Sequence, residues 1–545
     1  MGTFVGCGLL SLGCGGSAQV APQPQVPVAE GPTQTERVAS NDPFALPSEH
    51  EVDRIPDEPK GPPDLDTWRR LENPKGLPAR PASCKVSKPV KAVGPCLDEA
   101  TALTQLDSAM AKTGSERDAA LAGLASCKLP PGFVTALRAE LSDPQCADAI
   151  TDPWLEKPQA EAKPSIVHIL VGQSLGAKLA RTVLGQPTLS PPFSKAQTEA
   201  FLKTKLAPWA IAQAQLVQDI SAAGSQLAGL GQAILATEAG RADLRFVEVA
   251  RQVPTAPEFG KDPELKQIYE SALEQALEPR KARGRDATLV GLRAFADSGV
   301  ISGSTRMHNA RTMLATMYGG RRVDGLDALI VPAPAGADQA VAATGRRAIP
   351  SFLWSEVPGL ATAAAHEADT APNAMLLAPE QRRSSQPQQD SAERVGRART
   401  SLRLAATHFR RSSADAAIDL TAGLPRNEHV EILLALGLAL HQGPKDVVTM
   451  MAGSTPASLG YRKLDALEAV AKKKGAYAAA ATFDAALLRE IAPPEGAERA
   501  YFEDLATRYR TAERLFGSAP EAKLAAERAK HAEEIARAAA APVAP

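Results

Sequence analysis

The chain has 545 residues, which is too long for one compact core, so two or three domains joined by linkers are expected. Charged residues (23%) and hydrophobic residues (44%) occur at globular levels, so a wholly disordered chain is not expected. The formal net charge of −1 lacks the positive excess typical of nucleic-acid-binding proteins, so we expect no nucleic acid partner. Few residues are aromatic, and alanine and leucine dominate the apolar ones, which favours helices over strands.

The N-terminal residues 1–14 carry a short apolar run that ends at a cysteine. Leu12, Gly13 and Cys14 match the last three positions of a lipobox, although Ser11 stands where leucine is usual. This start resembles the signal of bacterial lipoproteins, in which the cysteine that follows the cleavage site takes the lipid. The resemblance implies a lipid anchor at Cys14 and a place in the cell envelope, in the periplasm or at the outer membrane. Secretion is the alternative.

Residues 15–83 are rich in proline and polar groups and show no sustained helical or strand period. We expect them to form a disordered tether between the anchor and the folded part of the chain. No later stretch reaches the roughly 18 apolar residues of a membrane span. We therefore expect the protein to contact the membrane through its N-terminal lipid alone.

Four of the six cysteines lie outside the signal, in one segment: Cys84, Cys96, Cys127 and Cys146. An even number in one segment predicts two disulfides, and so export to an oxidising compartment. Three connectivities are open, of which Cys84–Cys96 with Cys127–Cys146 joins the nearest neighbours along the chain. A zinc site is the weaker alternative, because no pair has Cys-x-x-Cys spacing and no histidine lies among them. We expect no metal and no cofactor.

Residues 84–332 form a first block in which helical segments recur with short breaks. Val134, Leu137 and Leu141, for example, recur at steps of three and four, which indicates one buried helical face. We expect a helical domain with the cysteines at its N-terminal end. Residues 333–394 are broken by proline and glycine and then become polar, which predicts an irregular linker.

Residues 395–540 are predicted to form stacked helical hairpins. Two of the predicted turns, at Gly443 and Gly475, are 32 residues apart, close to the 34-residue period of tetratricopeptide repeats. In the second hairpin, Leu464 and Leu467 also fall at positions of that pattern. The block therefore resembles tetratricopeptide repeats. The resemblance implies an α-solenoid whose curved surface holds a peptide or protein.

One motif suggests catalysis. Residues 172–176 read GQSLG and match Gly-x-Ser-x-Gly, which in serine hydrolases presents the serine at a sharp strand-to-helix turn. A histidine must then accept the proton of Ser174. The candidate bases further along the chain are His308, His366, His408, His429 and His441.

Two observations oppose a catalytic Ser174. The segment before it is helical, whereas the hydrolase fold needs several strands of a parallel sheet there. Apolar residues such as Val167 and Val171 also recur every four positions, as they do on a helix. We therefore predict a helix over residues 165–180, with two glycines at which another helix packs closely.

The sequence thus predicts a mostly α protein, made of stacked helical hairpins in two blocks that follow a disordered tether. We expect an exported, lipid-anchored, non-catalytic scaffold of the bacterial cell envelope that binds a protein or peptide partner. A serine hydrolase that uses Ser174 is the first alternative. A purely structural envelope spacer is the second.

Overall fold

The computed structural model describes most of the chain, in segments separated by gaps. The described residues are 42–52, 59–91, 94–191, 193–253, 261–300, 305–319, 322–333, 353, 356, 391–452, 460–461 and 463–539. Regular secondary structure in these segments is helical, and the helices pack on one another, which confirms the predicted fold class. None of the described helices is both long and apolar enough to cross a membrane. Cys14 and nearly all of the predicted linker 333–394 lie outside the described residues.

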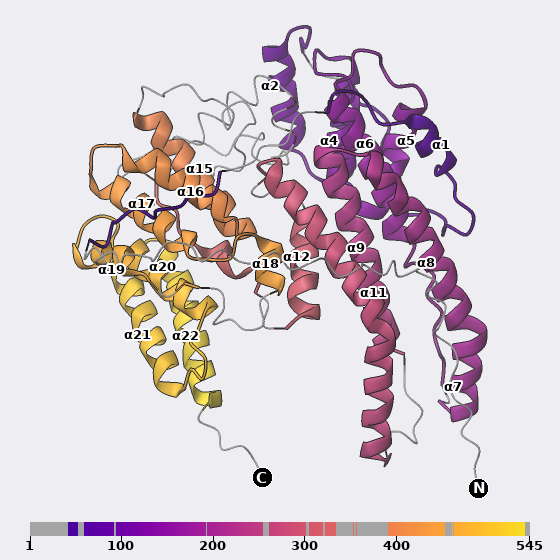
Figure 1. Ribbon diagram of the computed structural model, residues 1–545. Helices are drawn as coiled ribbons and strands as arrows, with labels where there is room; N and C mark the ends of the chain where they lie inside the picture. The colour runs from indigo at the N-terminus through magenta and orange to yellow at the C-terminus, as the bar shows by residue number, and fades with distance from the viewer. Residues whose placement is uncertain are drawn as a thin grey trace, which may run out of the picture.

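The first lobe contains the helices before residue 333, coloured indigo to rose in Figure 1. They are α1 (Leu65–Arg70), α2 (Glu99–Met110), α3 (Gly114–Gly123), α4 (Phe133–Leu141), α5 (Asp148–Glu156), α6 (Pro164–Arg181), α7 (Lys195–Phe201), α8 (Ala207–Ala222), α9 (Gly229–Arg251), α11 (Pro263–Asp297) and α12 (Thr305–Met317). Helix α9 packs against both α6 and α11. Its apolar side chains Ile234, Leu244 and Val247 are fully buried, so α9 forms the centre of this lobe.

Glycines bring α9 very close to its two neighbours. A Cβ atom on Gly172 of α6 would lie 2.5 Å from the backbone oxygen of Gly231 on α9. On the other side of α9, a Cβ on Gly240 would lie 2.1 Å from the side-chain oxygen of Thr288, and one on Gly291 of α11 would collide with α9 in the same way. This confirms that the GQSLG segment is a helix packed closely against another helix.

The second lobe is a stack of helical hairpins, coloured orange to yellow in Figure 1. Its helices are α15 (Ser391–His408), α16 (Arg411–Ala422), α17 (Glu428–His441), α18 (Val447–Ala452), α19 (Asp465–Lys472), α20 (Ala478–Ile491), α21 (Arg499–Phe516) and α22 (Glu521–Ala539). Helices α17 and α19 end just before the predicted turns at Gly443 and Gly475. Helix α17 is apolar on every side and contacts α15, α16 and α19, so it lies inside the stack. Asn427 caps its N-terminus by accepting a hydrogen bond from the Val430 N–H at 2.9 Å.

Ion pairs join the two lobes at the C-terminal end of α11. Arg293 of α11 pairs with Asp446, and Asp297 pairs with Arg410 at the start of α16. The buried imidazole of His408 donates a hydrogen bond from Nε2 to the carbonyl oxygen of Val300 at 2.7 Å. The long helix α11 therefore links the glycine contacts of the first lobe to the second lobe.

The segment at residues 322–333 packs against the second lobe. The Ile330 N–H donates to the carboxylate of Asp484 on α20 at 2.9 Å, and Arg403 of α15 donates to the carbonyl oxygen of Leu329 at 2.8 Å. Asp484 is fully buried, and burial raises the pKa of its carboxyl well above the ordinary value. Arg311 of α12 also donates to the carbonyl oxygen of Val323 and pairs with Asp327. The segment, which the sequence placed at the end of the first domain, therefore contacts both lobes.

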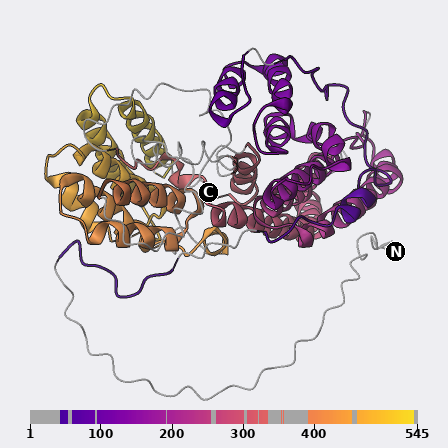
Figure 2. The ribbon, with the colours of Figure 1, turned by 90° about the horizontal axis from the view of Figure 1, so that it is seen from above.

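The prediction of a disordered tether over residues 15–83 is wrong for the described part of that segment. Residues 42–52, which we call the strap, run along the second lobe, as the indigo trace beside the orange helices shows in Figure 2. Residues 59–83 return to the first lobe and form α1, where Trp68 is only 1% exposed. A single large aromatic side chain and a few charged groups thus fix a stretch whose composition resembles a linker.

The close contact between α6 and α9 predicts a large effect of one added methyl group. We expect Gly172→Ala to lower the free energy of unfolding by about 1–3 kcal/mol, because the new Cβ meets backbone that cannot move aside. Gly176→Ala, one turn further along α6, is the matched control. Its Cβ would meet the side-chain Cγ of Glu238 at 3.2 Å, and alanine favours a helix over glycine by about 0.5–1 kcal/mol. Chemical denaturation of both variants measures the difference, and equal stabilities would contradict the account.

Candidate functional site

Ser174 lies in the middle of α6, so the GQSLG motif forms no strand-to-helix turn. Its side chain is 0% exposed. Its location gives a substrate no access to the hydroxyl group in this conformation. The structure therefore contradicts the geometry on which the hydrolase alternative depends, namely an exposed serine at a tight turn.

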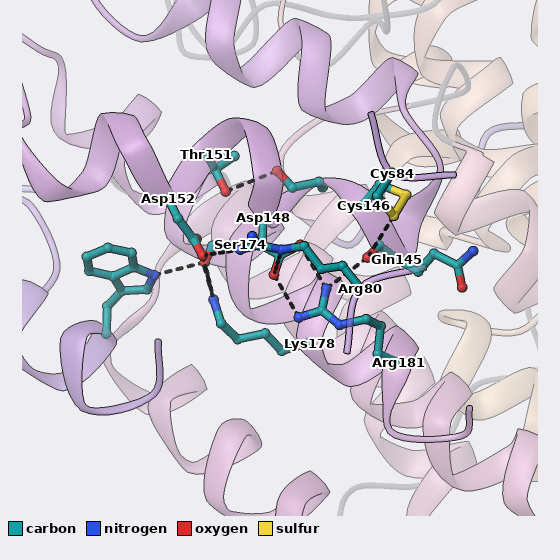
Figure 3. A network of polar contacts seen from close by, with 12 residues as sticks. Arg80, Cys84, Gln145, Cys146, Asp148, Thr151, Asp152, Ser174, Lys178 and Arg181 are labelled. Carbon is teal, nitrogen blue, oxygen red and sulfur yellow. Dashed lines mark hydrogen bonds and ion pairs between the residues drawn. A yellow bond between two sulfur atoms is a disulfide. The ribbon is translucent and has the colours of Figure 1, made fainter. Parts of the chain in front are cut away.

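The Ser174 hydroxyl takes part in three hydrogen bonds, drawn in Figure 3. The indole N–H of Trp68 and the ammonium group of Lys178 each donate to Oγ at 2.8 Å. The hydroxyl donates to Asp152 Oδ1 on α5 at 2.5 Å. A serine hydroxyl has one proton and two lone pairs, so these three partners use its full hydrogen-bonding capacity. The group acts as a junction between α1, α5 and α6.

Lys178 and Asp152 form a buried ion pair beside Ser174, with Nζ 3.3 Å from Oδ2. Burial lowers the pKa of the Lys178 ammonium and raises the pKa of the Asp152 carboxyl, because charges are costly away from water. The opposite charge of each partner offsets part of this cost. Separating the two groups would leave each charge buried without a partner or water. The pair therefore fixes the relative positions of α5 and α6.

A second carboxylate, Asp148, extends the cluster and is itself fully buried. Arg181 donates to both of its oxygens, at 2.8 and 2.7 Å, and also to the backbone oxygen of Gln145 at 2.8 Å. Arg80, from the segment before α2, donates to Asp148 at 3.0 Å and to Asp152 at 3.1 Å. Burial raises the pKa of the Asp148 carboxyl, but the hydrogen bonds and charge of Arg181 outweigh this effect and hold the pKa below its ordinary value.

Two disulfides lie in the same part of the first lobe, and they confirm the prediction of paired cysteines. The bonds are Cys84–Cys146 and Cys96–Cys127, so the pairing of nearest neighbours along the chain is wrong. Cys84 follows Arg80, whose ion pairs bring this segment to the start of α5, next to Cys146. The second disulfide closes the hairpin of α2 and α3, where the Lys128 N–H also donates to the Cys96 carbonyl oxygen at 2.9 Å. Tertiary contacts therefore decide the connectivity.

The candidate histidine bases have other places in the fold. His308 is exposed, His408 and His429 bond to backbone oxygens, and His441 donates to Asp415 at 2.5 Å. His366 lies outside the described residues. Among the hydrogen bonds of the described chain, Ser174 has no histidine partner. The described residues also contain no cluster of histidine, cysteine and acidic side chains arranged to hold a metal ion.

A cavity of about 850 Å³ lies where the two lobes and the strap meet. It is lined by Glu51, Val52, Arg293, Ala296, Asp297, His408, Arg410, Ser412, Lys445, Asp446 and Val447. The three basic and three acidic residues of this lining form three ion pairs with one another. Burial lowers the pKa of His408 to about 3, so its imidazole is neutral at physiological pH. The charges of the lining residues therefore sum to zero.

Ser174 stands out in the sequence through its motif, whereas its partners in the buried cluster do not. Lys178 has a recognisable signal, since it is a charged residue within a long apolar helix. Trp68 also has one, as the only aromatic residue between 45 and 132 in a polar stretch. Neither signal indicates a contact with Ser174, because Trp68, for example, lies 106 residues before Ser174 in the chain.

Comparison with protein-family models, with curated proteins and with solved structures gives no match. The resemblances to lipoprotein signals and to tetratricopeptide repeats therefore stay predictions.

Removing the Ser174 hydroxyl is expected to affect stability. Ser174→Ala leaves the Trp68 N–H and the Lys178 ammonium without their shared acceptor, which costs about 1–3 kcal/mol. Denaturation measures this loss, with Ser225→Ala, an exposed serine, as the control. A fluorophosphonate probe is expected to leave the folded wild-type protein unlabelled. Labelling that disappears in Ser174→Ala would overturn the structural role.

Peptide mapping without reduction tests the disulfide connectivity. We expect cross-linked peptides that contain Cys84 with Cys146 and Cys96 with Cys127, and no others from these four residues. The bonds span 62 and 31 residues, so loss of either one lowers the free energy of unfolding by about 4 kcal/mol in the chain-entropy account. Free thiols at these four positions, or the pair Cys84–Cys96, would contradict the structure.

Proposed function

We propose that this protein is an exported, lipid-anchored scaffold of the bacterial cell envelope, which binds a protein or peptide partner without catalysis. The observation that carries the proposal is the strap, an extended segment of the chain that lies on the helical hairpins of the second lobe. A stack of hairpins leaves an outer surface that can hold an extended chain. In this protein the outer surface of the second lobe already holds an extended segment, the strap.

The two disulfides support export. Disulfides persist in oxidising compartments, and four paired cysteines within one lobe of the chain fit that environment. Lipid attachment at Cys14 rests on the lipobox resemblance of Leu12, Gly13 and Cys14. The proline-rich residues that follow would then separate the lobes from the membrane surface.

The buried position of Ser174 weighs against the serine hydrolase alternative. The Ser174 hydroxyl donates its hydrogen bond to the carboxylate of Asp152, which is itself paired with Lys178 and Arg80. Among the described residues, no histidine contacts this hydroxyl. The structural spacer is the second alternative. A spacer requires no cavity between lobes and no surface that holds an extended segment, so these two features favour a binding role.

Lipid attachment has a direct test in the intact protein. In a bacterial host, we expect Cys14→Ala to abolish incorporation of labelled fatty acid and to move the protein from the membrane fraction to the soluble fraction. Cys7→Ala, in the same apolar run, is the matched control and should behave as the wild type. If Cys14→Ala keeps both the label and the membrane fraction, the anchor is assigned wrongly.

A further inference from the structure

We infer that the second lobe binds extended peptides that carry an aromatic residue and, seven positions later, a carboxylate, and that the strap occupies this site in the free protein. The inference rests on the proposed binding function and names its partner class. The site consists of α16, the turns after α16 and α17, and the end of α19. Its ligand in the structure is the strap, residues 42–52, which Figure 2 shows beside these helices.

The aromatic anchor of the strap is Phe44, which is half-buried and packs against the core. The guanidinium group of Arg426 lies 5.3 Å from the centre of its ring, and the ammonium group of Lys473 lies 5.9 Å away. Cations at these distances are attracted to an aromatic ring. Asp42 directs the ring towards them, because its side chain accepts the Phe44 N–H at 3.0 Å and its carbonyl accepts the Ala45 N–H at 3.1 Å.

The polar anchor lies at the other end of the strap. The Glu51 N–H donates to the Asp415 carboxylate of α16 at 2.7 Å, and the Glu51 carboxylate pairs with Lys445 at 3.2 Å. The His50 imidazole contacts Asp419, one turn further along α16, at 2.7 Å. The carboxylate of Asp415 thus accepts a backbone N–H of the strap, and the ammonium group of Lys445 pairs with a side-chain carboxylate of the strap. This arrangement selects both the chain direction and an acidic residue.

Between the two anchors the strap makes little contact with the lobe. Leu46 is 51% exposed, and Ala45, Ser48 and Glu49 are exposed as well. Two separated anchors can hold the strap because it belongs to the same chain, which gives it a high effective concentration at the site. A partner peptide with the same two anchors and better contacts between them can displace it.

The strap also forms part of the cavity wall. Glu51 and Val52 line the cavity between the lobes, and Val52 is 85% exposed. A peptide bound in place of the strap therefore reaches this cavity with the residues that follow its carboxylate. Displacement of the strap frees Lys445 from Glu51 at the cavity rim, where it can pair with the acidic residue of the incoming peptide.

A peptide with the sequence of residues 42–52, DPFALPSEHEV, tests the inference on the purified full chain. Fluorescence anisotropy of the labelled peptide is expected to show at least tenfold tighter binding to Phe44→Ala/Glu51→Ala than to the wild type, because the double variant releases its own strap. Leu46→Ala/Ser48→Ala, at exposed strap positions, is the matched control and should bind as weakly as the wild type. Equal binding by all three proteins, or no binding to the released variant, would overturn the inference.

The lobe side of the site is tested in the released variant. Adding Arg426→Ala and Lys445→Ala, both at exposed positions, is expected to weaken peptide binding at least tenfold while the thermal midpoint stays unchanged. A peptide with alanine at its phenylalanine and at its last glutamate should fail in the same way. Undiminished binding would place the peptide elsewhere. These measurements use purified protein, so a failed lipid-anchor test leaves their outcome unaffected.

Discussion

The close approach of α9 to α6 and α11 is the contact on which the rest of the structure depends. Glycines at both contacts let backbone meet backbone, and no other residue leaves the necessary room. Helix α6 then carries Ser174 and Lys178 to the buried cluster, while α11 carries Arg293 and Asp297 to the second lobe. The relative position of the two lobes therefore follows from packing at the centre of the first.

The cluster around Ser174 resembles catalytic machinery in its residue types but serves to hold segments together. It joins α1, α5, α6 and the segment of Arg80, and the nearby disulfide Cys84–Cys146 fixes the same region covalently. A buried polar group is costly without partners, so a fully partnered cluster specifies one arrangement of these segments. Ser174 is small, polar and central, and these properties explain its place without a substrate.

Local patterns in the sequence predicted the features that depend on local structure. The helix over residues 165–180, its close-packing glycines and the hairpins of the second lobe follow from apolar spacing and turn residues. The cysteine count predicted disulfides. The strap, the order around Trp68 and the cysteine pairing depend on contacts between distant residues: Glu51 and Asp415 are 364 residues apart. Composition alone therefore made an ordered segment resemble a disordered tether.

The proposed binding site depends on the strap being held on the second lobe as an intramolecular ligand. Amide hydrogen exchange of the Glu51 N–H in the full chain tests it most directly, because this group donates to Asp415. With residue-level resolution by mass spectrometry, we expect this N–H to exchange at least tenfold more slowly than in the free peptide of residues 42–52. Exchange of Glu51 at the free-peptide rate would contradict the account.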